Sequence, residues 1–494
     1  MHPFTLLLLL PVIGAVAIGL LPRQADRLNS RGQIQLLALA ASGSTLIAAW
    51  NVLLVFDTDS AGIQFIEKKV WQARMGSYYA LGVDGLSMPM ILLATLLFFV
   101  AVIASGAIRE RVKSYYLALM LLETAVMGVF MAQDWSLFYI FWELTLIPLF
   151  FLISRWGGQN CHQAALAFVL YTMGGSVFLL ISLLLAFDAS PNHSFAMDEM
   201  MRGLQGLSTR NQVIIFIGFL IGFGVKMPVF PIHGWLPLAH VEAPSPVSIL
   251  LSGILLKMGS YGLIRAATLL PGAVVALQPL LALLAVVTLL YGAVLAWRQS
   301  DLKAMIAYSS ISHMGVVLLG IASLTAAGLL GAITQMVAHG LAAGSLFLLV
   351  GLLYQRTHSR DIHHYSSLIR IAPRFAFFIA LAFMTAVALP GTAGFIAELH
   401  VLIGGMQRWG GWTALALGGA MLVGAGYSLR TVSQLFTGPV RPEMAHVTDL
   451  SWSEMSAASL LALLALLLGI LPAPMLDLMM ASVQQLETAW RGSL

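Results

Sequence analysis

Charged side chains interrupt several long apolar stretches of the sequence. They are Glu123, Glu143, Lys226, Lys257 and Glu398. A cation in bilayer hydrocarbon costs at least ~2.5 kcal/mol, so such residues are expected to face a helix-bundle interior or water. Buried lysines and carboxylates that reach water can hold and release protons. The residue types therefore indicate proton transfer, provided that the chain spans a membrane.

Glu143 and Lys226 have no partner one helical turn away on their own helices. Each must be neutral, hydrated or paired across helices. At an effective dielectric constant of 20 and ~4 Å, opposite charges attract by ~4 kcal/mol. A structural ion pair and a switchable pair, in which separation turns the lysine into a proton donor, both agree with the sequence.

Lys257 is the next candidate proton acceptor, because it lies mid-stretch among glycines and serines in LLSGILLKMGSYG. A lysine that extends to the membrane surface is the alternative. Imidazoles exchange protons near neutral pH, which adds four candidates that could otherwise be packing residues. These are His233, His240, His313 and His339, of which the last two have polar neighbours.

The remaining candidates differ in strength. Glu398 is the predicted site of proton release, or else a partner for a basic group at the membrane surface. Glu123 is predicted either to belong to the pathway or to be an acid at a helix interface. Asp301 and Lys303 are interpreted as a charge pair at the start of a helix.

The composition excludes a soluble globular protein. Of 494 residues, 59% are hydrophobic and 9% are charged, against roughly 25% charged in soluble domains. Cys161 is the only cysteine, which excludes disulfides and cysteine-ligated iron–sulfur clusters within the chain. The scattered basic residues do not support a nucleic-acid face, and no nucleotide, zinc or haem motif is present. We expect no metal or cofactor in this chain.

Apolar runs near the ~20 residues that a bilayer requires predict an all-α polytopic membrane protein. The fourteen predicted spans are 4–21, 34–54, 81–107, 114–131, 133–154, 164–187, 211–234, 245–270, 274–297, 302–324, 328–354, 374–407, 409–436 and 455–481. Odd-numbered loops, which include Arg23 and Arg27, hold 15 basic residues, and the other side, which includes Arg265, holds 8. Because cytoplasmic loops retain Lys and Arg, both termini are predicted to face away from the cytoplasm.

Two predicted spans are broken. Span 7 runs into KMPVFPIHGWLP, and span 12 contains LPGTAGFIAE just before Glu398. Prolines remove backbone donors, and broken helices at membrane depth are tolerated where they face protein or a wet cavity. Within the single membrane domain 1–494 we predict two inverted five-helix repeats, 114–270 and 271–436, with Lys226 in the first break matching Glu398 near the second.

Six motifs spread over nearly the whole chain carry a family resemblance. They are GVDGLSMP (82–89), FWELTLIP (141–148), KMPVFPIHGWLPLAHVEAPSPVSILLSGILLKMGSYGLIR (226–265), DLKAMIAYSSISHMG (301–315), QMVAHGLAAGSLFLLVG (335–351) and GFIAELHVLIGG (394–405). They resemble the antiporter-like membrane subunits of complex I. The chain is similar to the M-type (NuoM/NdhD) because Glu398 stands where the L-type has a lysine, and because the chain ends after fourteen spans.

The resemblance implies a proton-pumping subunit with no cofactor of its own. It implies proton transfer at Glu143, Lys226, Lys257, His313, His339 and Glu398, with His233 also in the pattern. It further implies L-type and N-type neighbours, bound lipids, and a peripheral redox arm whose subunits carry iron–sulfur clusters and bind quinone.

Among M-type subunits, the motif sequences most resemble NdhD of cyanobacterial photosynthetic complex I. This resemblance implies a thylakoid or bacterial cytoplasmic membrane, ferredoxin or NAD(P)H as electron donor, and plastoquinone as acceptor. Respiratory electron flow, cyclic electron flow and carbon-dioxide uptake all stay open as the form of the complex. Two alternatives remain open from the residues: a subunit of a multisubunit sodium/proton antiporter or membrane-bound hydrogenase, and a purely structural membrane subunit.

Overall fold

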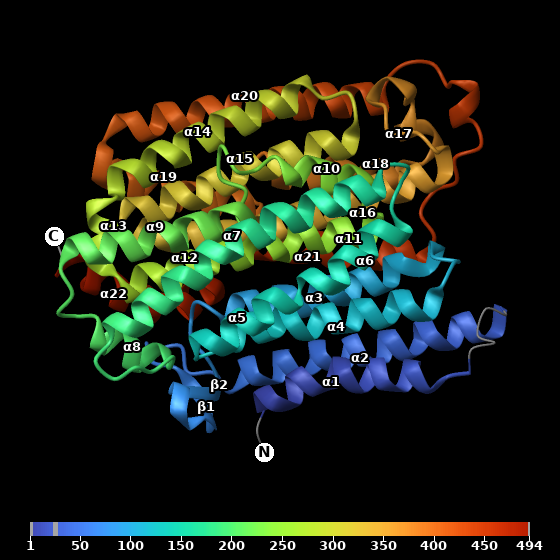
Figure 1. Ribbon diagram of the computed structural model, residues 1–494. Helices are drawn as coiled ribbons and strands as arrows, with labels where there is room; N and C mark the ends of the chain where they lie inside the picture. The colour runs from blue at the N-terminus through green and yellow to red at the C-terminus, as the bar shows by residue number, and fades with distance from the viewer. Residues whose placement is uncertain (1–2, 23–27, 493–494) are drawn as a thin grey trace. The chain divides into compact units, whose positions relative to one another are not determined.

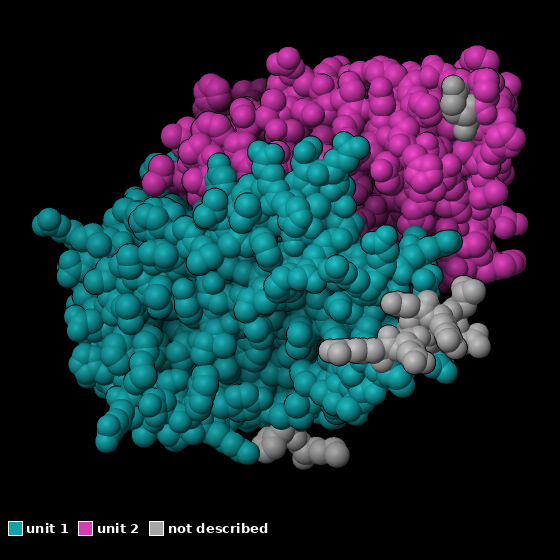
Figure 2. Space-filling view, turned by 45° about the vertical axis from the view of Figure 1, so that its right-hand side comes forward, with its two compact units in different colours: residues 1–227, 255–279, 477–494 teal, residues 228–254, 280–476 magenta. Residues whose placement is uncertain are grey.

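The computed structural model describes residues 3–22 and 28–492. Arg23 and Arg27, which contribute to the predicted orientation, lie outside this range. The chain divides into two compact units (Figure 2): unit 1 comprises 1–227, 255–279 and 477–494, and unit 2 comprises 228–254 and 280–476. Because the units interleave along the chain, neither is a continuous segment. The two predicted repeats remain predictions.

Unit 1 contains the amino-terminal helices and a small sheet (Figure 1). Its elements are α1 (Pro3–Leu20), α2 (Leu28–Leu54), β1 (Gln64–Gln72), β2 (Ser77–Val83), α3 (Met88–Ala104), α4 (Val112–Met131), α5 (Trp135–Leu144), α6 (Leu146–Trp156), α7 (Cys161–Ala189), α8 (Met197–Gly203), α9 (Thr209–Lys226), α12 (Leu256–Leu269), α13 (Pro271–Ala276) and most of α22 (Ala473–Arg491).

Unit 2 is built from the helices between these segments. Its elements are α10 (Trp235–Glu242), α11 (Ser245–Leu250), most of α14 (Gln278–Arg298), α15 (Leu302–Ser323), α16 (Ala326–Thr357), α17 (Leu368–Ile371), α18 (Pro373–Ala386), α19 (Ala393–Trp409), α20 (Gly411–Phe436) and α21 (Trp452–Ile470).

The helices confirm a polytopic all-α membrane protein. Twelve helical segments in the described part of the chain are long and apolar enough to cross a bilayer. They correspond one by one to predicted spans, and the two spans without such a counterpart are spans 7 and 12. These are the spans for which prolines predicted a break.

The breaks position the charged residues. In span 7 the chain leaves α9 at Lys226 and becomes helical again only at Trp235. In span 12, α18 ends at Ala386 and α19 begins at Ala393, and Gly391 between them has φ +94°, a conformation that favours glycine. Helix ends leave backbone groups without intrahelical partners. The breaks therefore place polar backbone beside Lys226 and before Glu398.

Two further interruptions were not predicted. Span 5 divides at Thr145 into α5 and α6, and span 8 contains a π-helical segment, Leu251–Leu255, directly before α12. Single π-helical turns often occur at functional sites. The first interruption lies next to Glu143 and the second lies two residues before Lys257.

Two predicted span limits are wrong. Residues 81–83 belong to β2, which pairs antiparallel with β1 in the predicted polar gap, so span 3 begins at Met88. The run 455–481 is two helices, because α21 ends at Ile470 and α22 begins at Ala473. Pro472, between these helices, has no backbone donor to continue the first of them.

Candidate functional site

The Lys226 ammonium is buried in unit 1, where the side chain is 1% exposed. Its Nζ donates a 2.9 Å hydrogen bond to Thr145 Oγ1 and lies 4.2 Å from the centre of the Trp142 ring. A hydroxyl and an aromatic face stabilise a cation without neutralising it. Lys226 is thus held by groups that leave its charge unbalanced at direct contact.

Glu143 lies beside this contact. Its charge acts on Lys226, and its neighbour one turn earlier on α5, Tyr139, interacts with its carboxylate. The side chain is half-buried, and Oε1 has no hydrogen-bond partner among the described residues. The structure therefore brings Glu143 and Lys226 together as the sequence suggested, with Thr145 as the direct partner of the lysine.

The geometry follows from the local sequence. The Asp134 side chain caps α5 by accepting hydrogen bonds from the backbone N–H groups of Ser136 and Leu137. The helix then ends at Leu144, and the Thr145 hydroxyl donates to the carbonyl of Trp142. That bond leaves the Thr145 oxygen free to accept from the Lys226 ammonium.

Lys257 is the second buried lysine of unit 1. It is the second residue of α12, and its side chain is 0% exposed. Tyr261 and Arg265 follow at intervals of four residues and therefore lie on the same face of α12. The lysine is thus the first of three polar residues along one helix face.

A histidine–glutamate cluster lies in unit 2. His313 on α15 has its Nδ1 3.0 Å from Gln335 Nε2 on α16 and 3.7 Å from Glu398 Oε1 on α19. The His313 and His339 rings are 5.2 Å apart between centroids. No described residue forms a hydrogen bond with Glu398 Oε2, although the side chain is 6% exposed. Three predicted residues meet here.

A small cavity adjoins this cluster. It has a volume of 20 Å³ and is lined by Ser312, His313, Glu398 and Tyr427, among other residues. This volume suffices for one water molecule, and the lining supplies the polar partners that a buried water needs. Because 3.7 Å is too long for a hydrogen bond, the cluster can exchange a proton between imidazole and carboxylate through one water.

His233 and His240 lie elsewhere in unit 2. The ring of His233 is 5.8 Å from Phe230 and 5.2 Å from Tyr291, and the ring of His240 stacks on Phe347 at 4.6 Å. Both histidines are buried. Both histidine rings thus contact aromatic side chains.

The side chains of Asp301 and Lys303 each contact a different partner. Asp301 Oδ1 caps α15 by accepting from the backbone N–H groups of Lys303 and Ala304, and Oδ2 lies 3.1 Å from Arg360 Nε. Lys303 Nζ donates a 2.7 Å bond to the carbonyl of Ala243. The side-chain partner of Asp301 is therefore Arg360.

Glu123 is fully buried in α4, with 0% of the side chain exposed. Neither carboxylate oxygen has a hydrogen-bond partner among the described residues. A buried carboxylate without partners is costly when ionised. Its role remains open between the two predicted alternatives.

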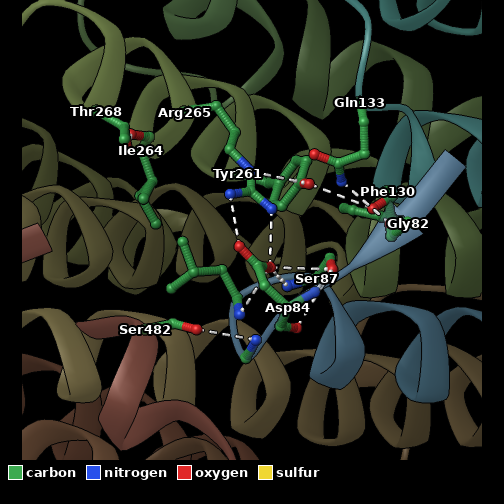
Figure 3. A network of polar contacts seen from close by, with 12 residues as sticks. Gly82, Asp84, Ser87, Phe130, Gln133, Tyr261, Ile264, Arg265, Thr268 and Ser482 are labelled. Atoms are coloured by element: carbon green, nitrogen blue, oxygen red, sulfur yellow. Dashed lines mark hydrogen bonds and ion pairs between the residues drawn. The ribbon is translucent and has the colours of Figure 1, made fainter. Parts of the chain in front are cut away.

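Sequence reasoning missed four contributors. Trp142 and Thr145 belong to the quoted motif FWELTLIP, and Gln335 begins QMVAHG, but an uncharged side chain gives no signal of its own in an apolar run. Arg265 was counted as a loop residue, whereas it is 9% exposed and forms an ion pair with Asp84 at 2.7 Å (Figure 3). Within the described residues, no group of three or more His, Cys, Asp or Glu side chains is arranged to hold a metal.

Residues 132–423 match the family described as "NADH:quinone oxidoreductase/Mrp antiporter, TM". The chain belongs to this family. It is 45% identical over 401 residues to the "NAD(P)H-quinone oxidoreductase chain 4 1" of Synechococcus elongatus, covering 81% of this chain and 74% of the relative. It is 36% identical over 480 residues to the "NADH-quinone oxidoreductase subunit M" of Rickettsia conorii, covering 97% of each.

A solved structure agrees with these relatives. The chain resembles a subunit of "Respiratory complex I from Thermus thermophilus with bound NADH" with a TM-score of 0.87 and 31% identity, covering 98% of this chain and 99% of that one. The chain is thus an antiporter-like M-type subunit of the complex I type, as the six motifs indicated. The relatives are subunits of quinone oxidoreductase complexes.

Proposed function

We propose that the chain relays protons across the membrane as part of a quinone-reducing complex. The observation that carries this proposal is the environment of Lys226, a buried lysine whose direct partners are a hydroxyl and an aromatic ring. A lysine in that environment, with Glu143 beside it, changes proton affinity when the distance to the carboxylate changes. Moving one charge against 100 mV costs ~2.3 kcal/mol, which is comparable to the ~4 kcal/mol attraction of a close pair.

The proposed relay uses six residues. Protons enter at the cytoplasmic side and are held in unit 1 by Lys226, whose proton affinity Glu143 sets, and by Lys257. In unit 2, His313 and His339 pass them to Glu398, which releases them to the opposite side. The 3.7 Å approach of His313 to Glu398 and the adjoining water-sized cavity support the last transfer.

The redox chemistry belongs to partner subunits in this proposal. They would carry the iron–sulfur clusters and bind quinone, while this chain holds no cofactor and contacts L-type and N-type subunits and lipids. Similarity to a cyanobacterial chain 4 supports the photosynthetic form, with ferredoxin or NAD(P)H as donor and plastoquinone as acceptor. That form would place the chain in a thylakoid or bacterial cytoplasmic membrane, with both termini on the non-cytoplasmic side.

A sodium/proton antiporter subunit is the second candidate, because the description of the matched family includes both kinds of complex. Partner proteins distinguish the two. Purification under mild conditions should yield subunits with iron–sulfur absorption if the chain serves a quinone reductase. Their absence, together with sodium-dependent proton movement, would favour the antiporter.

The decisive experiment measures quinone reduction and proton uptake together in vesicles that carry the assembled complex. Lys226→Ala should leave assembly intact and lower both activities, because a tightly coupled relay slows electron transfer as well. Lys226→Arg is the matched variant, since arginine keeps the charge but does not release its proton. A relay predicts that both variants fail.

A purely structural lysine gives a different result. Lys226→Arg would then retain proton uptake, because the charge alone would hold the helices. Lys69→Ala, at an exposed position of β1, serves as the control and should leave both activities unchanged. Unchanged proton uptake in Lys226→Ala would overturn the proposed relay.

A further inference from the structure

A buried ion pair in unit 1 has no part in the proposed relay. Arg265 Nη1 and Nη2 on α12 lie 2.7 and 2.8 Å from the two carboxylate oxygens of Asp84, in a bidentate contact (Figure 3). Arg265 is 9% exposed and Asp84 is 3% exposed. A buried ion pair adds little stability over apolar packing, because removing both charges from water is costly. Stability therefore does not explain why two charged residues are buried here.

Further hydrogen bonds hold the Asp84 carboxylate in place. Asp84 Oδ1 also accepts from the backbone N–H groups of Leu86 and Ser87 and from the Ser87 hydroxyl. Burial raises the pKa of Asp84, but the Arg265 charge and these hydrogen bonds outweigh burial and hold the pKa below its usual value. Asp84 thus stays ionised and fixes the position of the guanidinium.

Tyr261 lies between the ion pair and Lys257 on the same face of α12. Its hydroxyl accepts a 3.0 Å bond from Arg265 Nε and donates a 3.2 Å bond to the carbonyl of Phe130 (Figure 3). Lys257, Tyr261 and Arg265 follow each other at intervals of four residues on α12. At 1.5 Å per residue, Arg265 is about 12 Å along the helix from Lys257, with Tyr261 between them.

Arg265, the last of these three residues on α12, lines a cavity of 440 Å³. Asp84 also lines it, as do residues at the start of α8 and in α22. Its lining also includes Ile66, which is 60% exposed, and Asp198, whose side chain is 62% exposed, so the cavity reaches the surface of unit 1. By volume it holds on the order of ten water molecules.

The cavity lies at the predicted non-cytoplasmic end of unit 1. The β1–β2 hairpin, the loop before α8 and helix α22 pack together here. Phe195 N donates to the carbonyl of Gly76, and Ser482 Oγ accepts from Gly85 N at 3.1 Å. Protons that left Lys257 toward this cavity would bypass the second half of the relay.

We propose that Arg265, held by Asp84, is an electrostatic gate that keeps protons near Lys257 from passing into the cavity. A fixed arginine in the wall of the cavity repels protons and cations that approach it, as arginines do in other selective pores. This inference rests on the proposed relay and adds a function to it, namely the prevention of leakage through unit 1. In the gate, Arg265 supplies the charge and Asp84 is a positioning residue.

The test measures passive proton leakage without turnover. A pH gradient is imposed on vesicles that hold the assembled complex without electron donor, and its decay is followed with an internal pH-sensitive dye. Arg265→Gln should speed the decay about tenfold, the factor that corresponds to about 1.4 kcal/mol of barrier. Asp84→Asn keeps the positive charge of Arg265 and one amide oxygen that can still position it, so its decay should rise far less than that of Arg265→Gln.

This contrast separates a gate from a structural pair. If the pair only holds α12 in place, both variants should leak alike or neither should leak, and either result overturns the gate. Arg202→Gln is the matched control, because Arg202 forms an exposed i,i+4 pair with Asp198 beside the cavity. It should leave the decay unchanged.

Two further measurements keep the test decisive. If Arg265→Gln does not assemble, the double variant D84N/R265Q replaces the ion pair with two neutral amides and should leak as the single variant would. Proton pumping during turnover is recorded separately on the unsubstituted complex. Absent pumping there would contradict the relay, whereas normal pumping with no leak in Arg265→Gln or the double variant would contradict only the gate.

Discussion

Lys226 and Thr145 meet where two helices end. The ammonium is in the last residue of α9, and the hydroxyl that accepts its 2.9 Å hydrogen bond lies between α5 and α6. A helix C-terminus favours a cation, because its carbonyl dipoles carry partial negative charge. The direct contacts of the buried ammonium are thus a hydroxyl and an aromatic ring, and the charge of Glu143 beside them can change its proton affinity.

Removal of the Thr145 hydroxyl should therefore impair the relay. A hydrogen bond to a charged group contributes about 1.5–3 kcal/mol, so Thr145→Val should lower proton uptake by roughly ten- to hundredfold. Thr145→Ser keeps the hydroxyl and should retain most of the activity. The measurement is the rate of proton uptake in the vesicle assay, with assembly checked on native gels. Equal activities in the two variants would exclude Thr145 as a partner of Lys226.

Proton uptake should require the negative charge of Glu143. Glu143→Ala and Glu143→Gln both remove the carboxylate that acts on Lys226 and should lower proton uptake to a similar extent. Glu143→Asp keeps the charge on a shorter side chain and should retain partial uptake. The same vesicle assay checks this order. Intact pumping in Glu143→Ala would count against the switch.

Gln335 is expected to control the tautomer of His313. An amide nitrogen only donates, so with Gln335 Nε2 at 3.0 Å the Nδ1 of His313 is the acceptor, and in that tautomer the ring proton is on Nε2. A rotated amide would present its oxygen to a protonated Nδ1. The amide can therefore match both charge states of the imidazole while Glu398 lies 3.7 Å away.

Gln335→Leu should thus slow proton uptake several-fold, because a neutral hydrogen bond contributes about 1 kcal/mol and the tautomer is no longer fixed. Gln299→Leu at the end of α14, where the amide bonds only the Leu295 carbonyl in the described contacts, is a suitable control. Nitrogen-15 NMR of labelled histidines would report the tautomer directly. An unchanged Nε2–H tautomer in Gln335→Leu would contradict this role.

The sequence predicts the fold to the extent that hydrophobicity dictates it. Long apolar runs must form spans, and Pro228, Pro231 and Pro390 predict two of the breaks because proline cannot continue a helix. Pro148 also accounts for the break at Thr145, because its ring clashes with the carbonyl of Leu144 four residues earlier, where α5 ends. The π-helical segment at Leu251–Leu255 contains no proline. That segment has no comparable local signal in the sequence.

In the candidate site too, some features are predicted by the sequence and others are seen only in the fold. Lys226, Lys257 and Glu398 are evident from the sequence because charge in hydrocarbon is costly. The partners of these residues are not evident, because Thr145 is 81 residues from Lys226 and Asp84 is 181 residues from Arg265. Arg265 lies near the end of predicted span 8 (245–270) and is counted with the loop residues, and the fold shows that it is buried.

The ion pair between Lys68 on β1 and Glu199 on α8 should make the hairpin sensitive to pH. Its Nζ–Oε1 distance is 2.9 Å. A hydrogen bond from Ser194 and the bond and charge of Lys68 lower the pKa of Glu199 below 4.5. Burial lowers the pKa of Lys68, but the bond to Glu199 and the nearby acidic charges outweigh it and raise the pKa above 10.5.

The stabilisation is therefore complete between pH 4.5 and 10.5. It is lost as the pH falls through the depressed pKa of Glu199, or rises through the elevated pKa of Lys68. Because both side chains are partly exposed, the pair contributes at most about 1 kcal/mol. Lys68→Gln should lower hydrogen-exchange protection of β1 up to about fivefold at pH 7. Lys69→Gln is the control, and equal protection in both variants would contradict the prediction.

Asp84 and Arg265 should show strong coupling in a double-mutant cycle. Removing one partner leaves an unpaired buried charge, so Asp84→Leu and Arg265→Met should each destabilise the subunit by about 3–5 kcal/mol. The double variant D84L/R265M buries apolar groups instead and should be less destabilised than either single variant. The half-inactivation temperatures of the purified complex measure the three effects. Additive losses would mean that the two residues act independently, in conflict with their bidentate contact.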